Sequence, residues 1–147
     1  MQLNADFRDL LCALNGAGAR YLLVGGYAVS YHAEPRFTKD LDVWVEPSTS
    51  NAPRVLAALR EFGAPLAGLT EQDLVRPDLI YQIGVPPNRI DVLTGQGDIP
   101  FERAWPNRVE ATYADVSVPV IGRLDLIAIK RRVGRPQDLI DADRLES

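Results

Sequence analysis

The sequence is poor in the residues that build disulfide frameworks and zinc sites. Among 147 residues there is one cysteine, Cys12, and one histidine, His32. A single thiol cannot form an internal disulfide, and without a second histidine or a nearby cysteine a zinc site is not expected. Cys12 falls on the apolar side of the first predicted helix, so we expect a buried, unreactive thiol.

Long apolar runs are missing as well. No segment approaches the ~20 apolar residues needed to span a bilayer, and the first residues do not lead from a basic start into an apolar signal core. We therefore expect a cytoplasmic protein with no membrane partner. Hydrophobic residues at 46% and charged residues at 24% are typical of a globular domain. The formal net charge of −4 argues weakly against a general nucleic-acid-binding protein, which needs a basic face.

The pattern of apolar residues predicts helices and strands that alternate along one domain. Helices are predicted where apolar residues recur every three or four positions, and strands where short apolar runs lie between glycines and prolines. The predicted helices are 3–14, 27–32, 51–62, 101–105, 123–133 and 137–145, and the strands are 21–24, 40–45, 78–84, 89–93, 109–113 and 116–121. Residues 63–77 resemble a loop. This order predicts an α/β (α+β) fold, a mixed β-sheet flanked by helices.

Two aspartates in one predicted strand carry the strongest functional signal. Because side chains alternate between the faces of a strand, Asp40 and Asp42 project from the same face. Two adjacent carboxylates repel each other when ionised, so they favour a cation between or beside them. Ligands with oxygen alone suit Mg²⁺, which completes its shell with water and substrate phosphates. The alternative is a pair of exposed acids, although aspartate is disfavoured in strands unless something compensates it.

Gly25 and Gly26 stand between the strand at 21–24 and a short helix. Glycine lets the backbone approach a bound group closely, and the start of a helix offers free N–H donors to an anion. A phosphate cradle beside two carboxylates is suited to phosphoryl or nucleotidyl transfer. A tight turn that binds nothing is the alternative interpretation.

This arrangement resembles the DNA polymerase β-type nucleotidyltransferase superfamily, in which a Gly-Gly or Gly-Ser turn precedes an Asp-x-Asp strand. Small bacterial members related to abortive-infection and toxin–antitoxin nucleotidyltransferases carry an Arg-x-Thr-x-Asp-x-Asp run, which residues 36–42 match. Their Lys-bearing helix and Gly-Arg-Pro-x-Asp element are matched by Lys130 and residues 134–138. The resemblance, over roughly 20–145, implies a polymerase-β-like fold with a core at about 20–121 and a C-terminal helical element at 122–147. It also implies an NTP substrate and Mg²⁺ or Mn²⁺ as cofactor.

The resemblance assigns a third carboxylate to a later strand, and Asp91 in the strand at 89–93 fits it. The implied metal ligands and catalytic residues are therefore Asp40, Asp42 and Asp91, the last of which also acts as general base. The alternative for Asp91 is a salt bridge to Arg89, which shares its strand face.

Contacts to the nucleotide are assigned to residues around these acids: Gly25, Gly26, Ser30, Arg36, Thr38 and Lys130. Many active members have a serine at the second position of the turn, whose hydroxyl contacts the terminal phosphates. Gly26 lacks that hydroxyl, so the contact is missing unless Ser30 or Thr38 supplies it. Arg36 is either a phosphate clamp or a surface charge, and Lys130 is either a site residue or a solvated one.

Three other features have two interpretations each. Trp44 shares the face of the two acids, where it either stacks on a base or packs at the edge of the site. Asp138 is better explained as the N-terminal cap of the last helix than as a catalytic residue. Arg131, Arg132 and Arg135 form either an anion-binding surface or, more often for such clusters, a solvated face.

The favoured function is Mg²⁺-dependent transfer of a nucleoside monophosphate from an NTP to a hydroxyl of a protein, an RNA or a small molecule. Asp40 and Asp42 hold the metal on the triphosphate, and Asp91 bridges a second. Because no large second domain is present to bind the acceptor, a co-encoded protein or an RNA is a plausible partner. The alternative is an antitoxin-like module that binds nucleotide without turnover. Gly26 supports the alternative, and the three retained carboxylates argue against it.

Overall fold

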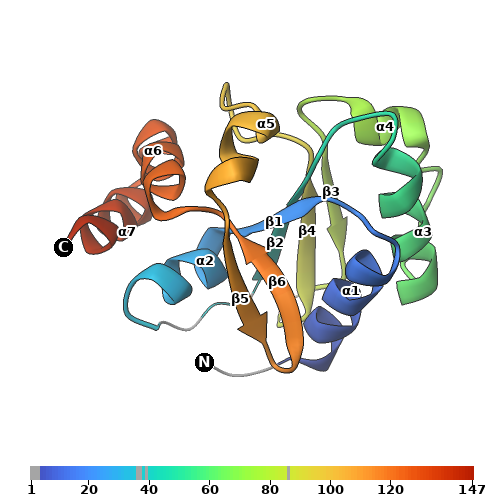
Figure 1. The fold of residues 1–147 in the computed structure, drawn as a ribbon, viewed down its shortest axis with the longest axis horizontal. Coiled ribbons are helices and arrows are strands. Elements are labelled where there is room, and N and C mark those ends of the chain that lie inside the picture. The colour runs from blue at the N-terminus through green and yellow to red at the C-terminus, as the bar shows by residue number, and fades with distance from the viewer. Residues whose placement is uncertain (1–3, 36–37, 39, 86) are drawn as a thin grey trace.

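A single mixed sheet of six strands forms the centre of the protein (Figure 1). The computed structural model describes residues 4–35, 38, 40–85 and 87–147. The strands are β1 (Tyr21–Val24), β2 (Asp40–Val45), β3 (Ile80–Ile83), β4 (Arg89–Leu93), β5 (Val109–Tyr113) and β6 (Val116–Val120). Their order across the sheet is β3-β4-β2-β1-β6-β5. The predicted fold class, a mixed sheet flanked by helices, is confirmed.

The sheet brings together strands that are far apart in the sequence. β2 pairs parallel with β4, with Asp40 opposite Arg89 and Asp42 opposite Asp91. β1 pairs antiparallel with β2, so that its last residue, Val24, lies opposite Asp42. β3 and β4 form an antiparallel hairpin at one edge, and β5 and β6 form another at the opposite edge.

One face of the sheet is covered by α1 (Ala5–Gly16) and α3 (Ala52–Phe62), and α4 (Glu71–Val75) packs against α3 (Figure 1). The side chain of Asn4 caps α1 by accepting hydrogen bonds from the backbone N–H groups of Asp6 and Phe7. Such a cap satisfies donors that have no partner within the helix. The buried stripes of both helices belong to one hydrophobic core with alternate residues of β2.

The other face carries α2 (Gly25–His32), α5 (Phe101–Ala104), a 3₁₀ turn (Trp105–Asn107) and the pair α6 (Arg123–Val133) and α7 (Pro136–Glu146) (Figure 1). α6 ends at Gly134, whose φ of 71° lies in the left-handed region that favours glycine. Pro136 then begins α7, where its fixed φ suits the first turn. α6 and α7 pack on each other and both contact α2.

Two of the predicted segments differ notably from the structure. α2 begins at Gly25 rather than Tyr27, so both glycines lie in its first turn. The segment 63–77, predicted as a loop, contains α4, which is nucleated by a capping box between Thr70 and Asp73. Asn51 does not cap α3 with its side chain. It instead hydrogen-bonds the backbone N–H and carbonyl of Arg20.

The prediction that Cys12 is buried is wrong, because the thiol is exposed. Phe7, Leu10, Leu11 and Leu14 form the buried stripe of α1. Cys12 follows Arg8 by four positions, so it shares the side of the helix that carries Arg8 rather than the buried stripe. Among the described residues, no helix combines the length and the apolar character that crossing a membrane requires.

Candidate active site

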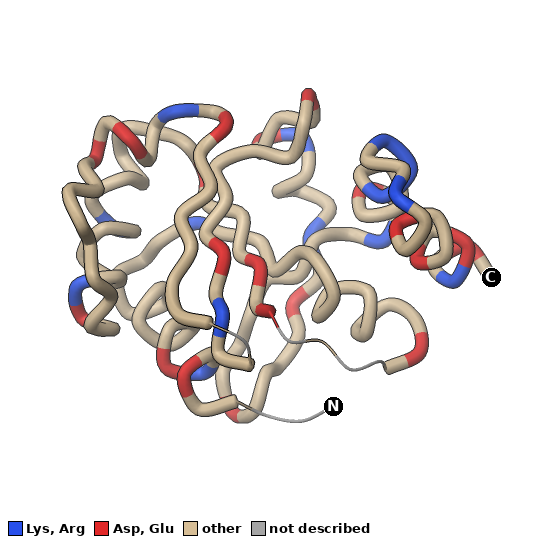
Figure 2. The backbone as a smooth tube through the Cα atoms, turned by 180° about the vertical axis from the view of Figure 1, so that it is seen from behind, with Lys and Arg blue, Asp and Glu red and all other residues tan. Residues whose placement is uncertain are grey.

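The parallel pairing of β2 with β4 brings three acids to one face of the sheet. Asp42 lies directly opposite Asp91, and Asp40 is two residues before Asp42 on the same face. Their neighbours Leu41 and Ile90 point to the opposite face and are almost fully buried in the core. Figure 2 shows acidic positions on adjacent strands near the middle of the molecule, and charges of both signs on the C-terminal pair of helices.

The backbone of Gly25 touches the carboxylate of Asp42. A Cβ atom at this position would lie 2.1 Å from Oδ2 of Asp42, which is far inside van der Waals contact. The φ of Gly25 is 68°, a conformation that side-chain-bearing residues rarely adopt. Gly25 is therefore required both by the backbone turn into α2 and by the space that Asp42 occupies.

The environment of Asp42 disfavours its charged form. Burial is the largest cause, followed by the charges of Asp91 and Asp40, and together they raise the pKa of Asp42 to about 7. Lys130 opposes the shift, and a side-chain hydrogen bond with Asp91 adds to it. In the absence of a cation, Asp42 is therefore partly protonated near neutral pH.

Arg89 holds both carboxylate oxygens of Asp91. Its Nε lies 3.1 Å from Oδ1 and its Nη2 lies 3.2 Å from Oδ2. The salt bridge considered as the alternative role for Asp91 is thus present in the structure. It does not remove Asp91 from the site, because both residues lie on the face that carries Asp40 and Asp42.

Asp40 supplies an oxygen that is suited to a metal ion. Its Oδ1 is buried and has no hydrogen-bond partner among the residues that the structure describes. A buried carboxylate oxygen without a partner costs free energy, which a bound cation would remove. Within the described part of the chain, no three His, Cys, Asp or Glu side chains are already gathered around one point. Mg²⁺ is usually bound by one or two carboxylates together with substrate phosphates and water, so the residues present fit this ion.

Lys130 is paired rather than solvated. Its Nζ lies 3.3 Å from Oδ1 of Asp138 and 3.3 Å from Oδ2 of Asp141, and its side chain is only 12% exposed. This network joins α6 to α7 beside Asp42, as the effect of Lys130 on the pKa of Asp42 shows. Lys130 therefore supports one wall of the site.

Asp138 combines two roles. It caps α7 as predicted, because its Oδ2 accepts a hydrogen bond from the backbone N–H of Arg135 at 3.3 Å. The same oxygen accepts one from Nε of Arg135 at 2.8 Å. Burial acts to raise the pKa of Asp138, but Arg135 and Lys130 outweigh it and lower that pKa.

A cavity of about 150 Å³ lies between the acids and the C-terminal helices. Gly25, Asp42, Lys130 and Arg135 line it. Arg135 was not among the predicted site residues, although it belongs to the Gly-Arg-Pro-x-Asp element noted in the sequence. Arg135 reaches the cavity because the chain turns at Gly134. No local sequence pattern predicts the direction of that turn.

The other predicted nucleotide contacts lie as follows. The hydroxyl of Thr38 donates to the backbone carbonyl of Asp40 at 3.3 Å and so supports the start of β2. Ser30 is buried within α2, and Arg36 lies outside the described residues. Of the two interpretations of Trp44, the structure supports packing at the edge of the site. The side chain is fully buried and meets Phe101 edge-on, with ring centroids 5.2 Å apart. His32 binds the backbone carbonyl of Ile121 at 2.7 Å.

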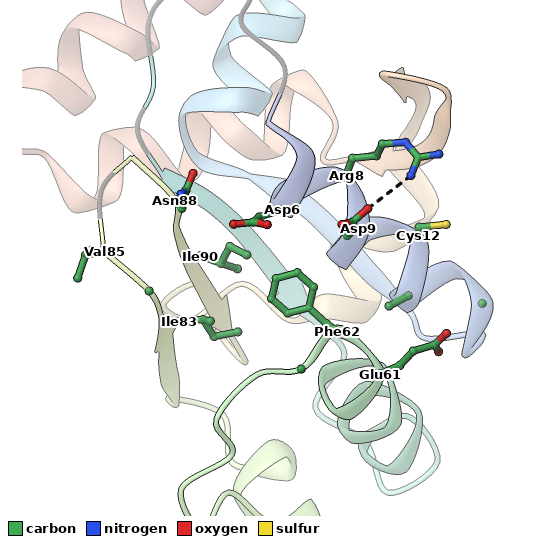
Figure 3. A pocket seen from close by; sticks show the side chains of 14 residues that line it. Asp6, Arg8, Asp9, Cys12, Glu61, Phe62, Ile83, Val85, Asn88 and Ile90 are labelled. Carbon is green, nitrogen blue, oxygen red and sulfur yellow. Dashed lines mark ion pairs between the residues drawn. The ribbon is translucent and has the colours of Figure 1, made fainter.

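A larger cavity, of about 730 Å³, lies on the other face of the sheet (Figure 3). Residues of α1, the end of α3 and the β3–β4 hairpin surround it, and Cys12 stands at its edge (Figure 3). Ile90 lines this cavity, whereas the next residue, Asp91, points to the opposite face. The larger cavity is therefore separate from the carboxylates.

The same arrangement of strands and helices occurs in solved antibiotic-modifying enzymes. The lincosamide antibiotic adenylyltransferase LnuA, solved with lincomycin bound, matches with a TM-score of 0.62 and 14% identity, over 100% of this chain and 99% of that chain. The antibiotic-resistance factor ANT(2'')-Ia in solution matches with a TM-score of 0.61 and 16% identity, over 95% of this chain and 80% of that chain. The fold of this chain is therefore similar to the folds of these two proteins.

A crystal structure of ANT(2'')-Ia in complex with adenylyl-2''-tobramycin also matches, with a TM-score of 0.57 and 16% identity, over 95% of this chain and 84% of that chain. No family model matches the sequence, and no curated protein matches it. At these identities the likeness concerns the fold alone, and it agrees with the predicted fold class.

Proposed function

We propose that the protein transfers a nucleoside monophosphate from an NTP to a hydroxyl group of a small molecule. The observation that carries this proposal is the pairing of Asp42 with Asp91 directly beside the glycine turn. It places an acidic metal-binding face within reach of a helix start that can bind phosphate. The fold shared with known nucleotidyltransferases supports the proposal.

Asp40 and Asp42 would hold a divalent metal. Oδ1 of Asp40, which has no hydrogen-bond partner among the described residues, would be one of its ligands. When bound there, Mg²⁺ or Mn²⁺ would neutralise triphosphate charge and act as a Lewis acid on the phosphoryl oxygens. The two carboxylates orient the triphosphate by holding its counter-ion.

The triphosphate would lie over the first turn of α2. Gly25 and Gly26 begin this helix, where free N–H groups favour an anion. Lys130 and Arg135 line the same cavity as Asp42 and offer N–H donors there, although both also pair with Asp138. Gly26 has no hydroxyl for the terminal phosphates, and the hydroxyl of Thr38 is engaged with the backbone of Asp40. Phosphate binding is therefore assigned to backbone donors and these two basic side chains, with Arg36 and Ser30 as further candidates.

Asp91 would act on the acceptor. Its carboxylate accepts the proton of the acceptor hydroxyl as that oxygen forms a bond to the α-phosphorus. The bond from the α-phosphorus to the oxygen of the β-phosphate breaks, and pyrophosphate leaves with the electron pair. Arg89 fixes the orientation of Asp91 through its two hydrogen bonds.

A small-molecule acceptor is favoured by the structural neighbours, one of which binds lincomycin and another adenylyl-tobramycin. A protein or RNA acceptor, as in the abortive-infection and toxin–antitoxin group, is supported only by the sequence runs 36–42 and 134–138. A nucleotide-binding module without turnover is the second candidate function, and Gly26 is the residue that favours it.

The test combines binding with transfer. Mg²⁺ and ATP together should raise the melting temperature of the wild type by mass action, and Asp42→Asn should abolish most of that shift. Transfer should be followed with α-³²P-labelled NTPs against aminoglycosides, lincosamides, bulk tRNA and any co-encoded protein. Label on an antibiotic would support the proposal, and label on tRNA or protein would move the acceptor to that class. Binding of NTP with no labelled acceptor would favour the module, and equal metal-induced shifts in both proteins would overturn the site.

A further inference from the structure

Arg89 is a basic residue placed among the three carboxylates. It lies opposite Asp40 in the register of β4 with β2, on the same face as the acids. It chelates both oxygens of Asp91, at 3.1 and 3.2 Å. The charges of Asp40 and Asp42, as well as that of Asp91, act on its guanidinium. One cation of the protein is therefore built into the acidic face.

The net charge of the three carboxylates and Arg89 limits how many cations they can balance. Three ionised carboxylates and one guanidinium leave two negative charges, which a single divalent cation balances. Lys130 does not change this count, because Asp138 and Asp141 already pair with it. An arginine stays protonated at every physiological pH, so the charge that it contributes is permanent.

The free ligand atoms are divided unequally. Among the described residues, Oδ1 of Asp40 is buried and has no hydrogen-bond partner. Both oxygens of Asp91 already accept hydrogen bonds from Arg89, and the Asp91 side chain also hydrogen-bonds Asp42. Bidentate pairing between arginine and a carboxylate is among the stronger side-chain interactions, because each bond is assisted by charge. The carboxylate oxygens best placed to bind a cation are therefore those of Asp40 and Asp42.

We propose that Arg89 takes the place of a second divalent metal, so that the chain binds one divalent ion, at Asp40 and Asp42. Arg89 is then a positioning residue: it neutralises Asp91 and holds its carboxylate in a fixed orientation toward the acceptor. This inference rests on the proposed function and replaces the second metal that the sequence resemblance implied. It makes the number of bound metal ions depend on one side chain that is not itself a metal ligand.

The number of bound Mn²⁺ ions tests the proposal without any turnover. Electron paramagnetic resonance of free Mn²⁺, with calorimetry in parallel, should be measured for the folded chain in the presence of α,β-methylene-ATP, which resists cleavage at the α-phosphate. The wild type should bind one Mn²⁺ per chain. Arg89→Gln should bind two, because both oxygens of Asp91 become available and a further negative charge is uncovered. Arg89→Lys, which keeps the charge, should stay at one.

Arg131→Gln is the matched control, because Arg131 pairs with Asp143 and Glu146 away from the three acids. It should leave the count at one. Two ions in the wild type, or one ion in a folded Arg89→Gln, would overturn the inference while leaving the proposed function intact. No bound ion in any of these proteins would overturn the metal site itself. The wild-type count requires no variant to fold, so two ions there would overturn the inference even if Arg89→Gln is unstable.

Discussion

Gly25 packs directly against the carboxylate of Asp42. The carboxylate fits there because glycine has no side chain. The end of β1 lies opposite Asp42, and a Cβ atom on Gly25 would meet Oδ2 of Asp42 at 2.1 Å. The conformation of the glycine turn therefore depends on the residue at position 42, and the position of the Asp42 carboxylate depends on Gly25.

Gly25→Ala should displace the carboxylate of Asp42. The substitution combines the cost of a left-handed backbone, about 1–2 kcal/mol, with a steric clash. We expect loss of most Mn²⁺ binding and at least a tenfold fall in transfer rate. Gly18→Ala is the matched control, because Gly18 has a similar φ of 70° and open space around it. It should lose a similar backbone contribution but keep metal binding, measured by calorimetry. Equal metal affinity in the two variants would contradict the assigned role of Gly25.

The elevated pKa of Asp42 predicts a pH dependence of stability without metal. Its pKa of about 7 in the folded protein lies above the usual value of 3.8, so the folded protein binds the proton more tightly than the unfolded chain. The free energy of unfolding should therefore fall as pH rises from about 4 to about 7 and then level off. The total loss should be on the order of a few kcal/mol, because the stabilisation is present only while the carboxyl group keeps its proton.

Asp42→Asn should lose this part of the pH dependence. The variant should match the wild type near pH 4 and be the more stable of the two at pH 8. Urea denaturation at the two pH values, with EDTA present, measures the difference. If the free energy of unfolding of the wild type, relative to that of the variant, increased with pH, the predicted direction of the Asp42 pKa shift would be wrong.

Asp40 and Asp91 should fail in different ways when they are substituted. Asp40→Asn removes the partnerless ligand oxygen, so both nucleotide binding and turnover should weaken. Asp91→Asn leaves the proposed metal ligands in place and should keep near-normal binding of NTP with Mg²⁺, while turnover falls by about 100-fold or more. Steady-state kinetics with an identified acceptor, together with equilibrium binding of the nucleotide, separate the two. An unchanged kcat in Asp91→Asn would exclude Asp91 as the base.

Lys130 should contribute more to stability than its neighbour Arg131. Lys130→Met removes a cation from beside the buried acids Asp138 and Asp141, and breaking a buried pair in this way costs about 3 kcal/mol or more. Arg131→Met removes pairs with the exposed acids Asp143 and Glu146 and should change stability little. Chemical denaturation of both variants gives the comparison. A large loss in Arg131→Met with none in Lys130→Met would reverse the interpretation of this network.

The parts of the structure that follow from local patterns were predictable. The bounds of β1, β2, β4 and α6 coincide with the predicted segments, because the apolar runs end at glycines and prolines. The short α4 was missed because its helix signal is one capping box, between Thr70 and Asp73. Cys12 was misplaced because it adjoins the buried stripe of α1 without belonging to it.

The site depends more on contacts that are distant in sequence. Alternation along β2 places Asp40 and Asp42 together from the sequence alone. The register that sets Asp91 opposite Asp42 is a property of the parallel pairing, and only the family resemblance pointed to it. The choice of Asp138 and Asp141 as partners of Lys130 depends on how α7 folds back on α6. No local pattern distinguishes a paired lysine from a solvated one.

Residues on the two sides of the small cavity lie far apart in the sequence. Gly25 and Asp42 leave the ribosome well before Lys130 and Arg135, which line the same cavity. A nascent chain can therefore form the acidic face before the basic side chains opposite it are made. A chain interrupted before Lys130 would carry the acidic cluster alone.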